Sequence, residues 1–235
     1  MNSQTIYVLI HSPLVGGLTW RLVADQMQKC GLEVLAPTLN DSSNSTKPFW
    51  KQHVESVSKA LTNIPPDIPI NWIAHSGAGP LLPAIRQPIP NPVNAYVFVD
   101  AGIPVNGATR LNLMSLEDAG WANEFQKVLE SGERFPTWSF DDLQAIIPDD
   151  SLRRQTVAEL QPRGLDFFTE PIPVFDGWPD APCVYIQFSE SYEWDVSQAR
   201  QAGWTTYQLQ AGHFHMLVEP KEITQLIVEA VNNIP

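Results

Sequence analysis

The sequence predicts an α/β fold, with a mostly parallel six-stranded sheet flanked by helices and a helical insertion after the fourth strand. Short, continuous apolar runs alternate with segments whose apolar residues recur at helical spacing, as expected of strands buried on both faces and of the helices that cover them. This alternation stops after Ile103 and resumes at Cys183. One apolar run ends at Ser76, between small residues, and a helical pattern follows directly, which indicates a strand, a sharp turn and a helix.

The first part of the chain contains four predicted strands joined by helices. Strands are predicted at 5–11, 33–37, 70–75 and 95–99, and helices at 18–30, 49–61 and 79–86. Gly31 is a typical stop for the first helix. Alternating strands and helices with short connections favour right-handed crossovers and a parallel sheet.

Residues 105–178 contain no buried strand pattern, and we expect a helical lid (cap) there. Helices are predicted at 116–130, at 140–147 behind Ser139, and at 151–160 behind Asp149 and Asp150, which are residue types that cap helix N-termini. Many aromatic residues lie in this segment, and we expect most of them to pack it onto the sheet and one or two to line a cavity. Strands at 183–188 and 205–210 and helices at 195–202 and 220–232 complete the fold. The core domain therefore comprises residues 1–104 and 179–235.

Composition narrows the classes of partner. The 235 residues are 43% hydrophobic, which suits one domain with an insertion. The net charge of −12 argues against nucleic acid and anionic membrane surfaces. No signal peptide is recognised, and no apolar run approaches the roughly 20 residues of a spanning helix, so we expect a cytoplasmic protein. Cys30 and Cys183 lie in no metal-type spacing; free thiols are favoured and a disulfide is the alternative.

Polar residues follow the predicted strands, at the edge of a parallel sheet where ligands bind. They are His11, Ser12, Ser76, Asp100, Ser189, Glu190, Glu193, His213 and His215. A serine, a carboxylate and a histidine in that chain order match the order of a hydrolase triad on this kind of sheet. A serine hydroxyl needs a histidine to take its proton, and the histidine needs a carboxylate that fixes its tautomer.

The turn at Ser76 has the features of a nucleophile elbow. Such a turn strains the backbone and admits only small residues two positions before and after the serine. Here these residues are Ala74 and Ala78, where the usual pattern has glycine. The N–H of Gly77, at the start of a helix, can receive an oxyanion.

The chain resembles the α/β-hydrolase family, and within it the branch of plant methyl esterases and hydroxynitrile lyases. The resemblance covers nearly the whole chain and rests on the serine elbow and three further motifs. These are His11-Ser12-Pro13 followed by Gly16-Gly17 and Trp20, Val99-Asp100-Ala101 through Pro104, and Gly212-His213-Phe214 with Pro220. It implies a helical lid after the strand that ends at Asp100, with Ser76 as the nucleophile and His213 as the base.

The acid of the triad has several candidates. The resemblance places it in the loop after Phe188, near Ser191 or Tyr192, neither of which is acidic. The fold can also supply the carboxylate from the end of the preceding strand, so Asp100 is favoured. Glu190 is the alternative acid, and Glu193 or no acid at all are left open.

The oxyanion hole also departs from the family pattern. The resemblance assigns one donor to the second residue after His11, which here is Pro13 and has no N–H. The expected donors are therefore Gly77 and Leu14, with the Ser12 hydroxyl as a further contributor. Losing one donor can cost about 10²–10³ in rate.

Other candidate residues have simpler expected roles. Ser12, Trp121 and Trp138 are expected to line the substrate pocket. His11 is interpreted as structural, bonding loop backbone, and His75 as packing or hydrogen-bonding below the elbow. His53 is expected at the surface, and His215 is either a pocket or packing residue or exposed without a role.

The favoured function is a serine hydrolase that cleaves a small, largely apolar ester, thioester or lactone through an acyl-enzyme, with no cofactor and no metal. A lyase or a cofactor-free haloperoxidase could use the same site, and a lyase would need a cation of the lid near Ser76. The cations considered for that role are Lys127, Arg134, Arg153, Arg154 and Arg163. A binding protein silenced by Pro13 is the third reading. Nothing in the sequence separates a monomer from a homodimer.

Overall fold

A computed structural model of the protein describes residues 5–234, in which six strands form one parallel sheet in the order β2-β1-β3-β4-β5-β6. The strands are β1 (Ile6–Ile10), β2 (Glu33–Leu35), β3 (Ile70–Ser76), β4 (Val93–Ala101), β5 (Cys183–Gln187) and β6 (Thr205–Gln208). The predicted parallel sheet is confirmed. The strand order reverses between β1 and β3, and ligands bind at such a switch point, beyond the carboxyl ends of the strands.

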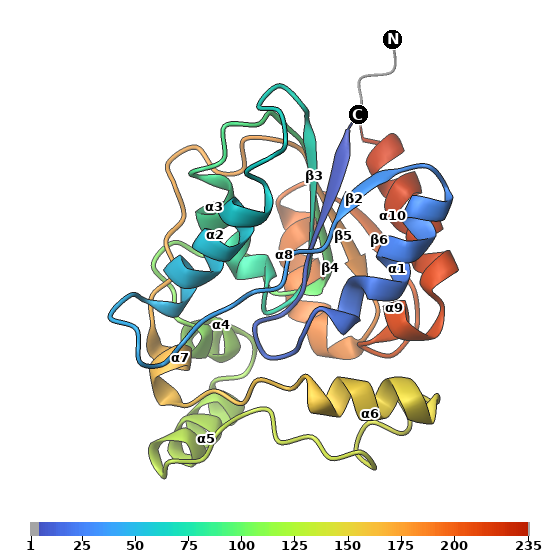
Figure 1. The fold of residues 1–235 in the computed structure, drawn as a ribbon. Helices are drawn as coiled ribbons and strands as arrows, with labels where there is room; N and C mark the ends of the chain where they lie inside the picture. The colour runs from blue at the N-terminus through green and yellow to red at the C-terminus, as the bar shows by residue number, and fades with distance from the viewer. Residues whose placement is uncertain (1–4, 235) are drawn as a thin grey trace.

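Helices cover both faces of the sheet (Figure 1). One face packs against α2 (Phe49–Ala60), α3 (Leu82–Arg86) and α8 (Glu193–Gln201), and the other against α1 (Leu18–Lys29), α9 (His215–Val218) and α10 (Pro220–Asn232). Alternate strand residues belong to opposite clusters: Val8 and Trp72 lie in the first, Leu9 and Ile73 in the second. Both faces are therefore apolar, as the continuous apolar runs predict.

Residues 105–178 are called the insert below; their helices lie beyond the carboxyl end of the sheet, at the bottom of Figure 1, and the segment after the last of these helices returns along the sheet, where Trp178 meets Tyr96 near the start of β4. The insert contains α4 (Arg110–Glu117), α5 (Ala119–Glu130), α6 (Asp150–Ala158) and α7 (Leu165–Thr169). The helix predicted at 116–130 is two helices, because Asp118 is extended and its carboxylate caps α5 by accepting the Trp121 N–H at 2.9 Å. Most of α4, and all of α7, was not predicted.

The helix predicted at 140–147 is wrong. The segment forms successive turns, held by i→i+3 bonds such as Gln144 N–H to Asp141 O at 3.1 Å. Pro148 follows Ile147 and disfavours helical backbone at the preceding residue. Ser139 still behaves as a capping residue, since it exchanges hydrogen bonds with Asp142, but a cap alone does not propagate a helix.

The insert is tied to the loop after β1. Glu159 Oε2 accepts the N–H of Leu18 at 2.9 Å, and Gln161 donates its N–H to Leu14 O at 2.9 Å. A Cβ at Gly16 would lie 2.2 Å from Glu159 Oε2, so the close approach requires glycine there. Residues 159–161 thus fix the loop that carries Leu14.

A second tie is ionic and buried. Arg163 binds both carboxylate oxygens of Asp41, at 2.5 and 2.6 Å, and His53 Nε2 lies 2.8 Å from the same carboxylate. Asp41 and His53 side chains are at most 1% exposed. The expectation that His53 lies at the surface is therefore wrong, because its partners come from a distant loop and from the insert.

A third tie joins the insert to α2. The Glu170 carboxylate accepts the N–H groups of Phe49 and Trp50, at 2.7 and 3.0 Å, where α2 begins. Arg110 of α4 binds the same carboxylate at 3.1 Å. A buried anion at a helix N-terminus is stabilised both by the unpaired N–H groups and by the helix dipole.

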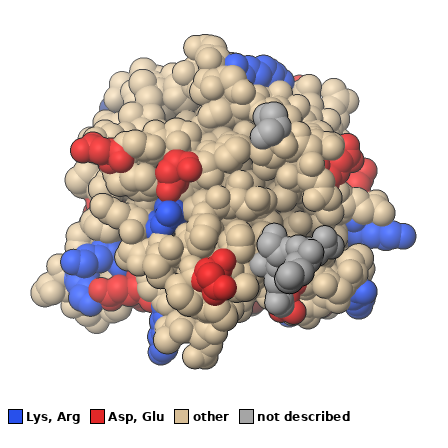
Figure 2. All heavy atoms as spheres, turned by 90° about the horizontal axis from the view of Figure 1, so that it is seen from above, with Lys and Arg blue, Asp and Glu red and all other residues tan. Residues whose placement is uncertain are grey.

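Charge is dispersed on the face opposite the insert. Figure 2 shows acidic and basic side chains interspersed there, with neither sign gathered in one place.

Both cysteines are free thiols, as predicted, with Cys30 exposed and Cys183 buried. Across residues 5–234, every helix is too short or too polar to span a bilayer.

Candidate active site

Ser76 ends β3 in a strained turn. Its φ is 57°, in the left-handed region that non-glycine residues avoid, and Ala78 donates its N–H to His75 O at 3.1 Å. A Cβ at Gly79 would lie 2.1 Å from the carbonyl oxygen of Gly102, so the elbow packs directly on β4. This is the geometry of a nucleophile elbow, in which the surrounding packing holds an unfavourable backbone conformation.

Asp100 lies at a bulge in the neighbouring strand. His75 pairs with Val99 and Ser76 pairs with Ala101, so Asp100 is the extra residue, with a φ of 44°. A bulge turns a side chain out of the alternation of its strand and is common next to active sites. The Tyr185 hydroxyl stabilises the distorted backbone, since it donates to Ala101 O at 2.7 Å and accepts the Ala101 N–H at 3.1 Å.

The Asp100 carboxylate is fully buried and accepts four hydrogen bonds. Oδ1 accepts the N–H groups of Phe188 and Ser189, at 2.8 and 2.9 Å. Oδ2 accepts the Ser189 hydroxyl and His213 Nδ1, both at 2.7 Å. Because an ionised carboxylate only accepts, Nδ1 of His213 carries a proton, and Nε2 of the neutral ring keeps a free lone pair.

The Ser76 hydroxyl lies 3.1 Å from the hydroxyl of Tyr192, which is the only hydrogen-bond partner of Ser76 Oγ within the described chain. The Tyr192 ring stacks on His213, with centroids 5.3 Å apart and an interplanar angle of 11°. Burial, and then the negative charge of Asp100, raise the pKa of Tyr192, so its phenol is neutral. Tyr192 thus joins Ser76 and His213.

Tyr192 is the residue of this site that the sequence did not single out. It lies near the position at which the resemblance places the acid, and a tyrosine there is not a candidate for the acid of a triad. Its short helix (Glu190–Tyr192) begins beyond Ser189, which binds Asp100. The sequence does contain one indication of its role, because a tyrosine that follows a strand at the carboxyl edge of the sheet can direct its hydroxyl towards the site.

His75 supports the loop of His213 from below. Its ring is fully buried, and Nε2 lies 2.9 Å from the carbonyl oxygen of His213, so Nε2 must carry the proton and donate. Burial, and then the repulsion that a protonated His213 would exert, hold the pKa of His75 well below its usual value, so the His75 ring is neutral. The expectation that His75 hydrogen-bonds below the elbow is confirmed.

The two expected oxyanion donors lie close together. Ser12 is buried, and its Oγ accepts a long hydrogen bond of 3.4 Å from the Leu14 N–H. A Cβ at Gly77 would lie 3.1 Å from the same Oγ and 3.8 Å from Cδ of Pro13. The backbone of Gly77 and the N–H of Leu14 therefore both lie near the Ser12 hydroxyl.

His11 bonds loop backbone, as predicted. Nδ1 donates to Ser12 O at 2.8 Å, and Nε2 accepts the Leu39 N–H at 3.0 Å. This arrangement needs the neutral ring, because a protonated Nε2 could not accept. Burial accordingly lowers the pKa of His11 to about 4.

We expect the free energy of unfolding to decrease as pH falls from about 6.5 towards about 4. In this pH window His11 binds a proton in the unfolded chain but not in the folded protein. Stability that is present above pH 6.5 is therefore lost towards pH 4, and His11 accounts for about 3 kcal/mol of that loss. Urea unfolding across the window measures the slope. His11→Gln, whose amide can make both hydrogen bonds, should flatten it; an unchanged slope would assign the effect to other groups.

Aromatic rings connect the insert to His213. Trp138 is half-buried and meets Phe214, the neighbour of His213, with ring centroids 6.0 Å apart. Phe135 and Phe125 continue the row towards α5, and Trp121, 51% exposed, stacks on Phe125 at its outer end. Of the three expected pocket residues, Ser12 and Trp138 therefore lie by the site, and Trp121 lies at the surface.

The remaining candidates lie elsewhere. Glu190 is exposed, Glu193 binds Gln187 at 2.9 Å, and His215 binds Glu222 at 3.0 Å. The insert cations considered have these partners: Lys127 binds Glu124, Arg134 binds Pro162 O, Arg153 and Arg154 bind Asp150, and Arg163 binds Asp41 and Pro13 O.

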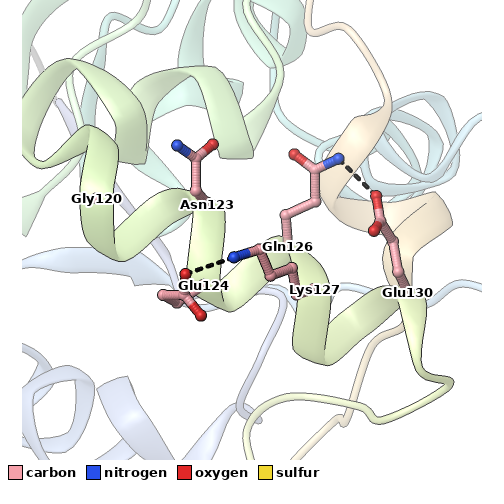
Figure 3. A pocket seen from close by; sticks show the side chains of 6 residues that line it. All are labelled: Gly120, Asn123, Glu124, Gln126, Lys127 and Glu130. Carbon is pink, nitrogen blue, oxygen red and sulfur yellow. Dashed lines mark hydrogen bonds and ion pairs between the residues drawn. The ribbon is translucent and has the colours of Figure 1, made fainter.

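Among residues 5–234, no three histidine, cysteine, aspartate or glutamate side chains are grouped to hold a metal ion. A hollow on the insert (Figure 3) is formed by one helix only and is bordered by ion-paired and hydrogen-bonded surface residues. Its lining residues are Gly120, Asn123, Glu124, Gln126, Lys127 and Glu130. None of these residues belongs to the site at Ser76.

Solved structures resemble the whole chain. An extracellular α/β-hydrolase from a Paenibacillus species, described as sharing structural and functional homology with tobacco salicylic acid binding protein 2, superposes with a TM-score of 0.77 at 18% identity, covering 96% of this chain and 98% of that one. Tomato methylketone synthase I complexed with 2-tridecanone gives 0.75 at 15%, covering 99% of each chain. A pyrethroid hydrolase from Sphingobium faniae gives 0.70 at 17%, covering 97% and 98%.

No protein-family model matches the chain, and no curated protein matches it by sequence. The likeness therefore lies in the fold. At these identities, coverage of nearly the full length, together with the parallel sheet and the strained serine turn, shows what the sequence resemblance implied about architecture: the chain has the α/β-hydrolase fold.

Proposed function

We propose that the protein is a serine hydrolase that cleaves a small, largely apolar ester, thioester or lactone. The observation that carries this proposal is the 2.7 Å hydrogen bond from His213 Nδ1 to the buried Asp100 carboxylate, beside the strained turn of Ser76. That bond leaves Nε2 of His213 as an acceptor, which is what a serine nucleophile requires. Two of the structures of the same fold are of polyneuridine aldehyde esterase, and another is of a pyrethroid hydrolase.

The proposed reaction has two halves. His213 Nε2 takes the proton of Ser76 as Oγ attacks the carbonyl carbon, and the carbonyl π electrons move onto its oxygen, which faces the Gly77 and Leu14 N–H groups. The tetrahedral intermediate collapses to an acyl-enzyme, and the leaving alcohol takes the proton from His213. Water then repeats the sequence and releases the acid. Asp100 stabilises the protonated ring in both halves.

The insert is proposed to act as a lid. It is fixed to the loop after β1 by Glu159, Gln161 and Arg163, and it carries Trp138 towards Phe214. Aromatic surfaces favour an apolar acyl or alcohol group, and the net charge of −12 disfavours anionic substrates. Lys127 and Arg134 are bound to partners within the insert, whereas Arg163 binds Asp41 and also donates to Pro13 O in the loop after β1, so it is the cation that the lyase alternative would have to use.

A binding protein with a silent triad is the second candidate, favoured by Pro13 and by the bond of Ser76 to Tyr192 rather than to His213. Fluorophosphonate labelling separates the two, because the reagent phosphonylates only an activated serine. We expect labelling on the peptide that contains Ser76, located by mass spectrometry, and none after heat denaturation. A native protein that resists the reagent would favour the binding protein.

A further inference from the structure

Two departures from the expected site meet at the nucleophile. Pro13 removes an N–H group where the resemblance expects an oxyanion donor, and the substitute, Leu14, already has its N–H turned to Ser12 Oγ at 3.4 Å. Tyr192 adds a hydroxyl 3.1 Å from Ser76 Oγ. The site therefore lacks one backbone N–H donor and has gained a hydroxyl that can donate a hydrogen bond next to Ser76 Oγ.

We propose that the Tyr192 hydroxyl donates a hydrogen bond to the oxyanion that forms when Ser76 attacks a carbonyl, in place of the donor that Pro13 lacks. This inference rests on the proposed hydrolase function. As the Oγ–carbon bond forms, the Ser76 proton goes to His213 Nε2 and the carbonyl π pair moves onto oxygen. The new anion lies about one bond beyond the carbon joined to Oγ, so a hydroxyl next to Oγ can reach it with a small movement.

Tyr192 has the chemical state that this role needs. Burial raises the pKa of its phenol, so the group keeps its proton and is a donor throughout the working pH range. Once Ser76 has given up its hydrogen and bonded to the carbonyl carbon, the phenol hydrogen can turn from Oγ to the developing anion. A neutral donor also leaves the general-base role to His213.

Tyr192 is also held in place, as catalysis by a preorganised donor demands. Its ring stacks on His213 at 5.3 Å, and its N–H donates to Ser189 O at 3.3 Å. Ser189 in turn binds the Asp100 carboxylate through both its N–H and its hydroxyl. The carboxylate that orients His213 therefore also anchors the segment that carries the phenol.

The test is a double-mutant cycle on kcat for short p-nitrophenyl esters. Tyr192→Phe keeps the stacked ring and removes the hydroxyl, and we expect kcat to fall by about 10²–10³ with KM little changed. Pro13→Ala restores the N–H and should recover at least about tenfold of that loss in the double variant, and the Pro13→Ala single variant completes the cycle. Tyr207→Phe, which removes a hydroxyl that meets Asn233 at 3.4 Å, is the matched control.

A trifluoromethyl ketone gives a second readout. Ser76 adds to it and forms a hemiketal anion that needs the same donor, so Tyr192→Phe should weaken its inhibition by a similar factor, whereas the corresponding alcohol should bind both proteins equally. Unchanged or increased kcat in Tyr192→Phe would overturn the inference and make Tyr192 a restraint on Ser76. Failure of Pro13→Ala to rescue would overturn the link to Pro13. A parent protein without turnover or labelling would refute the hydrolase function itself, and this inference with it.

Discussion

Replacing Ser76 with alanine is expected to lower kcat for short p-nitrophenyl esters by roughly 10⁴–10⁶-fold. The variant loses the atom that forms the acyl-enzyme, and what remains is the slow attack of water in the same pocket. The fold should be retained, because alanine keeps the Cβ at a position whose φ is 57° and whose hydroxyl has one hydrogen-bond partner among the described residues, Tyr192. Thermal unfolding should therefore change little.

Steady-state kinetics of the purified variant measure this effect, together with acylation of the peptide that contains Ser76 after a rapid quench. Ser115→Ala, at an exposed position of α4, controls for the loss of a serine hydroxyl elsewhere. Equal rates for the Ser76→Ala variant and the parent protein would show that any ester cleavage arises from another site or a contaminant, and the hydrolase proposal would fail.

Asp100→Asn is expected to lower kcat by about 10⁴-fold with the fold intact. The amide oxygen can still accept the N–H groups of Phe188 and Ser189, which bind Oδ1. The amide nitrogen would then face His213 Nδ1 and donate to it. The ring proton would move to Nε2, where it blocks the lone pair that has to accept the proton of Ser76.

The controls for this variant are Glu190→Gln and Glu193→Gln, which remove the two other candidate carboxylates, both of which follow β5 in the chain. Both should keep near-normal kcat, since Glu190 is exposed and Glu193 binds Gln187 and Arg200. Near-normal turnover in Asp100→Asn, with a large loss in Glu190→Gln, would transfer the acid role to Glu190.

Much of the architecture follows from local sequence. The apolar runs at β1, β3, β4 and β5 are long enough to be buried on both faces, and this alone indicates a parallel sheet covered on each side. The end of α1 at a glycine and the beginning of α10 at Pro220 have local causes, so the sequence predicts them. The elbow at Ser76 is equally local.

The secondary structure of the insert is harder to predict, because it depends more on tertiary packing than on the periodicity of apolar residues. Residues 140–147 have a helical pattern but form turns that end at Pro148. Asp118 divides one apolar pattern into two helices. His53 was misplaced at the surface for a related reason: a polar residue on a helix is buried when a distant carboxylate and arginine neutralise it, and neither is visible in a local window.

The sequence by itself determined which residue types reach the carboxyl edge of the sheet, since strand ends are local features. Only the tertiary structure decided how they meet. The bulge that directs Asp100 towards His213 exists because two strands pair out of step, and the phenol of Tyr192 reaches Ser76 because its loop is fixed to that same carboxylate. Register and loop anchoring are contacts between different segments: β3 and β4 pair across about 25 residues, and the loop of Tyr192 meets Asp100 and Ser76 across 89 and 116 residues, so no pattern within one segment encodes them.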